Sequence, residues 1–244
     1  MSLIKIYINK ASEGCIMGMG VYLIYFIIIM IIPIWAQSKV RNTFNKYARV
    51  PNETGLTGEQ VARRILDEHG LYNIDIEEVG GQLTDHYDPK KKVLRLSSNI
   101  YHGHSIAGTG VAAHEVGHAI QDKESYVPLR FRHALVPVAH FGSGASWLFI
   151  LAGMFLQSLN LLLIGVIFFA AAVLFQVVTL PVEFNASRRA IVQLGALGLI
   201  HDDEKPKVRK VLGAAALTYV AAALVAALEL LRFIMMFAGM NNRN

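Results

Sequence analysis

The longest uncharged stretch of this sequence does most to constrain its fold. Residues 133–182 contain no Asp, Glu, Lys or Arg, and shorter uncharged runs cover residues 14–38 and 211–228. A helix rises about 1.5 Å per residue, and a bilayer core is only about 30 Å thick. The long run is therefore expected to cross a membrane twice, with a break at the polar segment 157–160. The sequence predicts a mainly α-helical membrane protein with four transmembrane helices.

The predicted spans alternate with polar segments along the chain. The spans are expected at residues 19–36, 143–158, 161–181 and 212–239. Pro181 is expected to end the third span, because proline lacks the backbone N–H that a helix interior uses. Residues 1–18 form an N-terminal extension, and a true start at Met17 or Met19 would leave it outside the native protein.

The polar segments, residues 37–142 and 182–211, are predicted to lie in the cytoplasm. The whole chain is 54% hydrophobic and 17% charged, against about 45–50% and about 25% in soluble domains. Lys39 and Arg41 directly follow the first span, which is typical of the cytoplasmic side of a multi-pass protein in the cell membrane. The net charge of +5 therefore indicates a lipid bilayer as partner, and no nucleic-acid partner is expected.

Local patterns in the first polar segment predict a small α+β domain. A capping box precedes a helix expected at residues 58–69. Alternating apolar residues predict short strands at residues 72–77 and 93–97. Small and apolar residues then predict a buried helix at residues 106–122.

The last of these helices carries His-Glu-Val-Gly-His at residues 114–118, an H-E-x-x-H motif. Residues four apart share one face of a helix, so His114 and His118 can bind one Zn²⁺, with Glu115 near the fourth coordination position. A chance match would leave one Glu and two His inside an apolar helix, where unpaired polar groups are costly. The motif therefore predicts a zincin-like site.

A catalytic zinc site usually has a third protein ligand. Glu124 is one candidate, but it would need a glycine at position 121 to turn it toward the metal, and this chain has Gln121. His133 and His140 are further candidates, with packing or interfacial histidines as the simpler interpretation.

Glu183 is the stronger candidate for the third ligand. It ends the long uncharged run, and a helix in this region would place Ser187 one turn away. The alternative is a carboxylate at the membrane boundary that pairs with Arg188 or Arg189.

Three segments carry a resemblance to a known family. They are the residues around the H-E-x-x-H motif at 112–121, the Tyr-Asp-Pro turn at 87–89, and Glu-Phe-Asn-Ala at 183–186 with the following basic pair. Together they resemble the YugP-like neutral zinc metallopeptidases of bacterial membranes, over nearly the whole chain from about Met19. The chain is more distantly similar to the HtpX-like and CAAX-prenyl endopeptidases, whose third ligand begins a Glu-x-x-Ala-Asp motif.

The resemblance implies that Glu183 is the third zinc ligand. Ser187 stands where the distant relatives have the Asp of that motif. An Asp there would orient a ligand imidazole, and a Ser would do so more weakly.

The resulting hypothesis is a gluzincin-like zinc metallopeptidase that cleaves peptides or membrane proteins at the cytosolic membrane surface. Zn²⁺ would activate a water, and Glu115 would accept the proton of that water. The strand at residues 93–97 is expected to lie at a sheet edge and pair with extended substrate. Candidate stabilisers of the negative oxygen are Tyr101, His104, Arg188 and Arg189.

Two other classes of function fit the sequence less well. A non-catalytic zinc-binding membrane scaffold would have no use for Glu115 beside an open metal position. A metal transporter would need ionisable residues inside several spans, whereas the second and third spans contain only Gln176 and a few hydroxyls.

Overall fold

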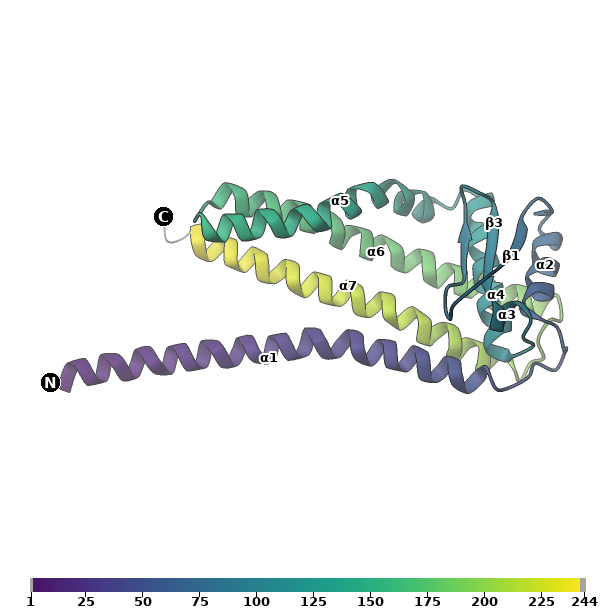
Figure 1. The fold of residues 1–244 in the computed structure, drawn as a ribbon, viewed down its shortest axis with the longest axis horizontal. Helices are drawn as coiled ribbons and strands as arrows, with labels where there is room; N and C mark the ends of the chain where they lie inside the picture. The colour runs from purple at the N-terminus through teal and green to yellow at the C-terminus, as the bar shows by residue number, and fades with distance from the viewer. Residues whose placement is uncertain (1, 242–244) are drawn as a thin grey trace.

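The computed structural model shows a bundle of long helices with a small α+β unit at one end (Figure 1). It describes residues 2–241, with side chains from Gly20 onward, so the side chains of the extension expected at residues 1–18 lie outside the described part. In chain order the elements are α1 (Ser2–Tyr47), α2 (Gly58–Glu68), β1 (Asp75–Val79), β2 (His86–Asp88), β3 (Val93–Ser97), α3 (Ser98–Tyr101), α4 (Ile106–Lys123), α5 (Val127–Phe155), α6 (Leu159–Ala196) and α7 (Lys205–Asn241).

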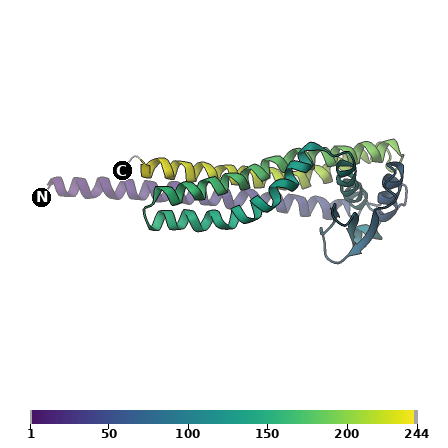
Figure 2. The same cartoon turned by 90° about the horizontal axis from the view of Figure 1, so that it is seen from above.

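Four helices, α1, α5, α6 and α7, are long and apolar enough to cross a membrane. They run along the length of the molecule in both views (Figures 1 and 2). The predictions of a mainly helical chain and of four candidate spans are confirmed.

Helix α6 continues through Pro181 to Ala196, so the proline does not end the helix. Its 38 residues correspond to a length of about 57 Å, which exceeds the thickness of a bilayer core. The part beyond Pro181 is held by packing, since Ala190 and Leu194 are buried in the core of the small unit. Tertiary packing thus outweighs the loss of one backbone hydrogen bond at the proline. Helix α5 likewise begins well before residue 143, at Val127.

Small residues allow α5 and α6 to pack closely as a hairpin. A Cβ placed on Gly153 would be 2.6 Å from the backbone nitrogen of Leu162, and one on Gly165 would be 2.8 Å from that of Ile150. Such close backbone approach is a common way for helices to associate in membranes, where burial of apolar surface supplies little driving force. The hairpin turns at Gln157, which has a positive φ of 52°.

The sheet has the strand order β1-β3-β2, so the strand at Val93–Ser97 lies in the centre. The expectation that it is an edge strand is therefore wrong. It pairs in parallel with β1 and antiparallel with β2, and it buries Val93, Leu94 and Leu96. Strand β2, which is too short to show alternation, forms the edge on the antiparallel side.

One hydrophobic core joins the small unit to the long helices. Val61, Ile65 and Leu66, which share one face of α2, are buried in it. Val208 of α7 contributes to the same core. The ends of α6 and α7 are thus structural parts of the small unit, and this places α6 next to α4.

Candidate metal centre

Helix α4 positions the H-E-x-x-H motif. The side chain of Ser105 caps its first turn by accepting a hydrogen bond from the backbone nitrogen of Gly108. Twelve of its residues are buried, so the helix runs through the interior of the small unit. Gly117 contacts α6 so closely that a Cβ there would be 2.7 Å from the carbonyl oxygen of Ala186. This contact brings His114 and His118 next to Glu183 of α6.

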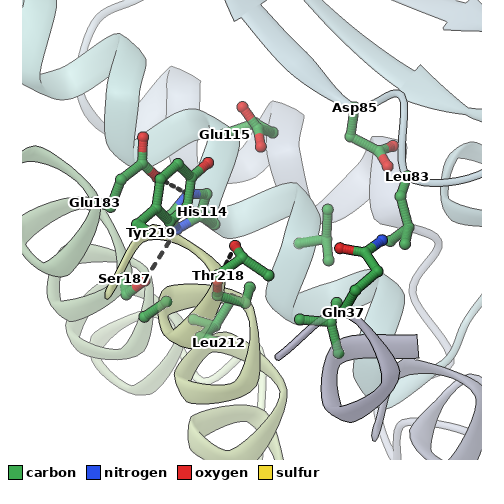
Figure 3. Close-up of a pocket in the computed structure, with 14 residues that line it drawn as sticks. Gln37, Leu83, Asp85, His114, Glu115, Glu183, Ser187, Leu212, Thr218 and Tyr219 are labelled. Atoms are coloured by element: carbon green, nitrogen blue, oxygen red, sulfur yellow. Dashed lines mark hydrogen bonds and ion pairs between the residues drawn. The ribbon is translucent and has the colours of Figure 1, made fainter. Parts of the chain in front are cut away.

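The three predicted metal ligands meet in the structure. Oε2 of Glu183 is 3.3 Å from Nε2 of His114 and 3.5 Å from Nε2 of His118. The two imidazole rings are nearly perpendicular, with an interplanar angle of 86°. Among the described residues, these three form a group that could hold a metal ion, with all ligand atoms within 4.8 Å of one another. Figure 3 shows Glu183 and His114 side by side.

Two observations indicate that the group fits Zn²⁺. Tetrahedral zinc with ligand bonds of about 2.0–2.2 Å has ligand-to-ligand separations of about 3.3–3.5 Å. The separations of Glu183 from the two histidines have this length. In addition, Oε2 of Glu183 is a buried oxygen with no hydrogen-bond partner within the described part of the chain. A buried carboxylate oxygen without a partner is costly unless a cation binds it.

A chain of hydrogen bonds fixes the orientation of His118. Arg189 can only donate, so Oδ1 of Asn185 accepts from it at 2.7 Å and from Nε2 of Gln121 at 2.9 Å. Nε2 of Gln121 also donates to the carbonyl oxygen of Val182 at 2.8 Å. The other end of the Gln121 amide, Oε1, therefore accepts from Nδ1 of His118 at 3.0 Å. This assignment leaves the lone pair on Nε2 of His118 free to bind a metal.

Ser187 orients the other histidine. Its Oγ is 3.1 Å from Nδ1 of His114 (Figure 3). A hydroxyl accepts this hydrogen bond without the charge that a carboxylate would add. Position 187 thus contacts a ligand imidazole as expected, through a serine hydroxyl instead of the stronger aspartate carboxylate.

Glu115 lies between two cavities that meet at the metal-binding group. The first, of about 250 Å³, is bordered by Gln37 and Val40 of α1 and by α7 (Figure 3). The second, of about 150 Å³, is bordered by β2 and by Arg132 of α5. Tyr219 of α7 lines both cavities. Burial raises the pKa of the Glu115 carboxyl above its ordinary value.

The alternative third ligands lie elsewhere. Glu124 forms an ion pair of 2.6 Å with Arg189. His133 lines the second cavity but is not a member of the metal-binding group. Glu183 itself pairs with Arg132, through Oε1 at 3.3 Å, and not with either arginine that follows it in sequence.

None of the candidate stabilisers of a negative oxygen, Tyr101, His104, Arg188 and Arg189, lines the two cavities beside this group. Arg188 lines a separate groove, and His104 lines a separate cavity beside Arg41. Tyr101 packs edge-on against His102. The residues with hydrogen-bond donors that do lie beside the metal-binding group are Arg132 of α5 and Tyr219 of α7.

Sequence reasoning did not identify the roles of Gln121, Arg132 and Tyr219. Gln121 follows His118 by three residues, so its position on the same helical face was a usable signal. The other two residues come from helices far along the chain, and no local pattern marks them.

The fold and the site define a membrane protein whose helices carry a His-His-Glu group able to hold a metal ion. The chain matches the model of the family described as "Putative neutral zinc metallopeptidase" over residues 22–238, and it belongs to this family. It is 54% identical over 210 residues to the "Putative membrane protease YugP" of Bacillus subtilis (strain 168), a match that covers 86% of this chain and 93% of that protein. No solved structure matches the chain. The family predicted from the sequence is confirmed.

Proposed function

We propose that this protein is a zinc-dependent endopeptidase of the cell membrane that hydrolyses peptide bonds at the cytosolic membrane surface. The observation that carries the proposal is the buried Oε2 of Glu183, which faces two imidazole nitrogens and has no hydrogen-bond partner among the described residues. Membership of a zinc metallopeptidase family supports the choice of metal. The similarity to a protein named as a membrane protease supports the reaction.

Each residue of the site has a role in this proposal. His114, His118 and Glu183 would hold Zn²⁺, and the bound metal would lower the pKa of a water and polarise the scissile carbonyl. The Glu115 carboxylate accepts a proton from the attacking water as the water oxygen bonds to the carbonyl carbon. Glu115 then delivers this proton to the amine nitrogen as the carbon–nitrogen bond breaks.

Two donors flank the position where negative charge develops. Arg132 carries a fixed positive charge, and its contact with Oε1 of Glu183 places it beside the metal-binding group. Tyr219 brings a hydroxyl into both cavities. Donors fixed before the reaction are among the largest contributions to catalysis of acyl transfer.

The substrate is an extended polypeptide, either a peptide or a membrane protein near its cytosolic edge. Strand β2 lies at a sheet edge and its residues His86 and Tyr87 line the second cavity, so its backbone can pair with a substrate strand. The first cavity reaches α1 and α7, which offers a path from the membrane side. In this proposal a substrate reaches the site either from the cytosol, past β2, or from the membrane, past α1 and α7.

The cytosolic orientation follows from the distribution of positive charge. Lys39, Arg41 and Lys46 lie in α1 after its apolar stretch, on the side of the small unit. Lys and Arg are enriched on the cytoplasmic side of membrane proteins. This distribution supports the proposal that the metal-binding group lies at the inner surface of the membrane.

The test compares the wild-type protein with Glu115→Gln, both purified in detergent. Zinc content is measured by elemental analysis, and cleavage is measured with unfolded casein and membrane-protein fragments. We expect both proteins to bind one zinc, and the variant to lose about 10²- to 10⁴-fold in cleavage rate, the usual contribution of general acid–base catalysis.

Equal cleavage by the two proteins would show that Glu115 is not the base. Zinc binding without cleavage by the wild-type protein, on every substrate offered, would favour the non-catalytic scaffold. Full zinc occupancy in Glu183→Ala would remove Glu183 from the ligand set.

A further inference from the structure

A groove between α6 and α7 opens on the outside of the bundle, next to the metal-binding group. It has a volume of about 410 Å³ and is lined mainly by apolar residues. Phe184 of α6 and Gly213 of α7 lie along it, and both are exposed. Nothing lies within 4 Å of the position that a Cβ on Gly213 would take, so the groove is open there.

Two arginines are the charged residues of this groove. Arg188 of α6 and Arg209 of α7 both line it, and both are exposed. Within the described part of the chain neither forms an ion pair, whereas their neighbour Arg189 pairs with Glu124. The groove contains no acidic residue. Its charge therefore suits an anion, and two guanidinium groups suit a phosphate.

The groove lies where the apolar parts of α6 and α7 end, and this position favours a lipid phosphate as the anion. On α7, Arg209 precedes the uncharged run 211–228, and on α6, Arg188 follows the uncharged run that ends at residue 182. Both arginines thus lie where the apolar parts of the two helices end, at the level of lipid headgroups. Toward the apolar runs of the two helices, the groove is lined by Phe184, Gly213 and Ala216, which offer carbon surface to the first part of an acyl chain.

We propose that this groove is a binding site for one anionic phospholipid. The phosphate lies between Arg188 and Arg209, and an acyl chain lies along the apolar wall beside Gly213. A diffuse attraction of basic residues to anionic lipid would need no groove. The combination of two arginines with an apolar wall in one groove distinguishes this site from such an attraction. The proposal does not depend on proteolytic activity.

The site also contacts the metal-binding group. Ser187 lines the groove and its Oγ is 3.1 Å from Nδ1 of His114. Leu212 and Ala216 line both the groove and the first cavity. A lipid in the groove would therefore border the path from the membrane to the site.

The test measures lipid binding to the full-length protein in detergent by native mass spectrometry. The probes are phosphatidylglycerol and phosphatidylcholine with identical acyl chains. We expect one phosphatidylglycerol per chain to bind about tenfold more tightly than phosphatidylcholine, because both lipids carry the phosphate but only phosphatidylcholine adds a positive headgroup charge next to the two arginines. Arg188→Gln combined with Arg209→Gln should abolish this preference.

The matched control combines Lys39→Gln with Lys210→Gln, which removes the same charge from exposed residues outside the groove. This control should keep the preference. Gly213→Leu keeps every charge and fills the groove, and it should weaken phosphatidylglycerol binding as strongly as the loss of the arginines. Zinc content and elution volume in size-exclusion chromatography show whether each variant is folded.

Three results would overturn the proposal. The first is an equal loss of phosphatidylglycerol binding in the control pair, which would indicate diffuse attraction. The second is unchanged binding in Gly213→Leu with an intact fold. The third is binding of soluble glycerol 3-phosphate as tight as that of the lipid, because the acyl chain would then contribute nothing.

Discussion

The carbonyl oxygen of Ala186 lies directly over Gly117, at 2.7 Å from the position that a Cβ on Gly117 would occupy. Gly117 is one of the two variable positions of the H-E-x-x-H motif, and Ala186 follows Glu183 by three residues on α6. The separation between the two histidines and the carboxylate therefore depends on the absence of a side chain at this position.

Gly117→Ala is expected to reduce zinc affinity by at least about tenfold. The added methyl group must push α6 away from α4, and overpacking of this kind costs about 1–3 kcal/mol. Affinity is measured by competition with a chelator in detergent. Gly144→Ala is the matched control, because nothing lies within 4 Å of a Cβ at Gly144. Unchanged affinity in Gly117→Ala would mean that the two helices have room to adjust.

Gln121→Ala is expected to lower zinc affinity by about 10- to 100-fold, the usual effect of removing a residue that orients a metal ligand. The substitution removes the acceptor that fixes Nδ1 of His118. Gln193→Ala on α6 serves as the control, since Gln193 lies outside the metal-binding group. Equal affinities of the two variants would show that His118 holds its orientation without Gln121.

If the proposed function holds, Tyr219→Phe is expected to lower kcat by about 10²-fold, the usual effect of removing one donor to a developing oxyanion. KM and zinc content should change little, because the ring remains and the hydroxyl acts in the transition state. Tyr25→Phe removes a hydroxyl elsewhere, one that donates to Glu229 at 2.8 Å. A rise in KM with kcat unchanged would assign Tyr219 to substrate binding.

Removal of the metal is expected to destabilise the wild-type protein. Zinc would join α4 to α6 through His114, His118 and Glu183, and a ligand that binds only the folded state stabilises that state. A zinc chelator should therefore lower the melting temperature of the wild type in detergent and leave that of Glu183→Ala unchanged. An equal shift in both proteins would show that the stabilising metal is bound elsewhere.

Local signals in the sequence predicted the two longer helices of the small unit and the residues at which they begin. The capping box of Thr57 and Gln60 is present at the start of α2, and Ser105 caps α4. Gly70, with a φ of 64°, follows the end of α2. These features depend on neighbouring residues alone, so a single sequence contains them.

The sequence could not predict features that depend on distant contacts. The chain from Leu159 to Ala196 forms one helix through Pro181 because its far end is buried in the small unit. The strand at Val93–Ser97 lies in the centre of the sheet because β2, only three residues long, covers one side of it. Neither partner could be identified from the local pattern.

Some residues of the candidate site could be predicted from local sequence, and others depend on contacts between distant parts of the chain. His114, Glu115 and His118 follow from the spacing within one helix. Glu183 was reached from its place at the end of an uncharged run and from the family resemblance. Arg132 and Tyr219 enter the site from other helices, so only the folded chain shows that they lie there.

The distribution of the metal-binding residues also determines when the group is complete during synthesis. The ribosome produces His114 and His118 before the α5–α6 hairpin, and Glu183 arrives only with the second helix of that hairpin. A nascent chain that has folded α4 but has not yet inserted α6 holds two of the three residues. The group of three residues is thus complete only once α6 has been made and packs against α4, and a chain that stops before α6 lacks its carboxylate.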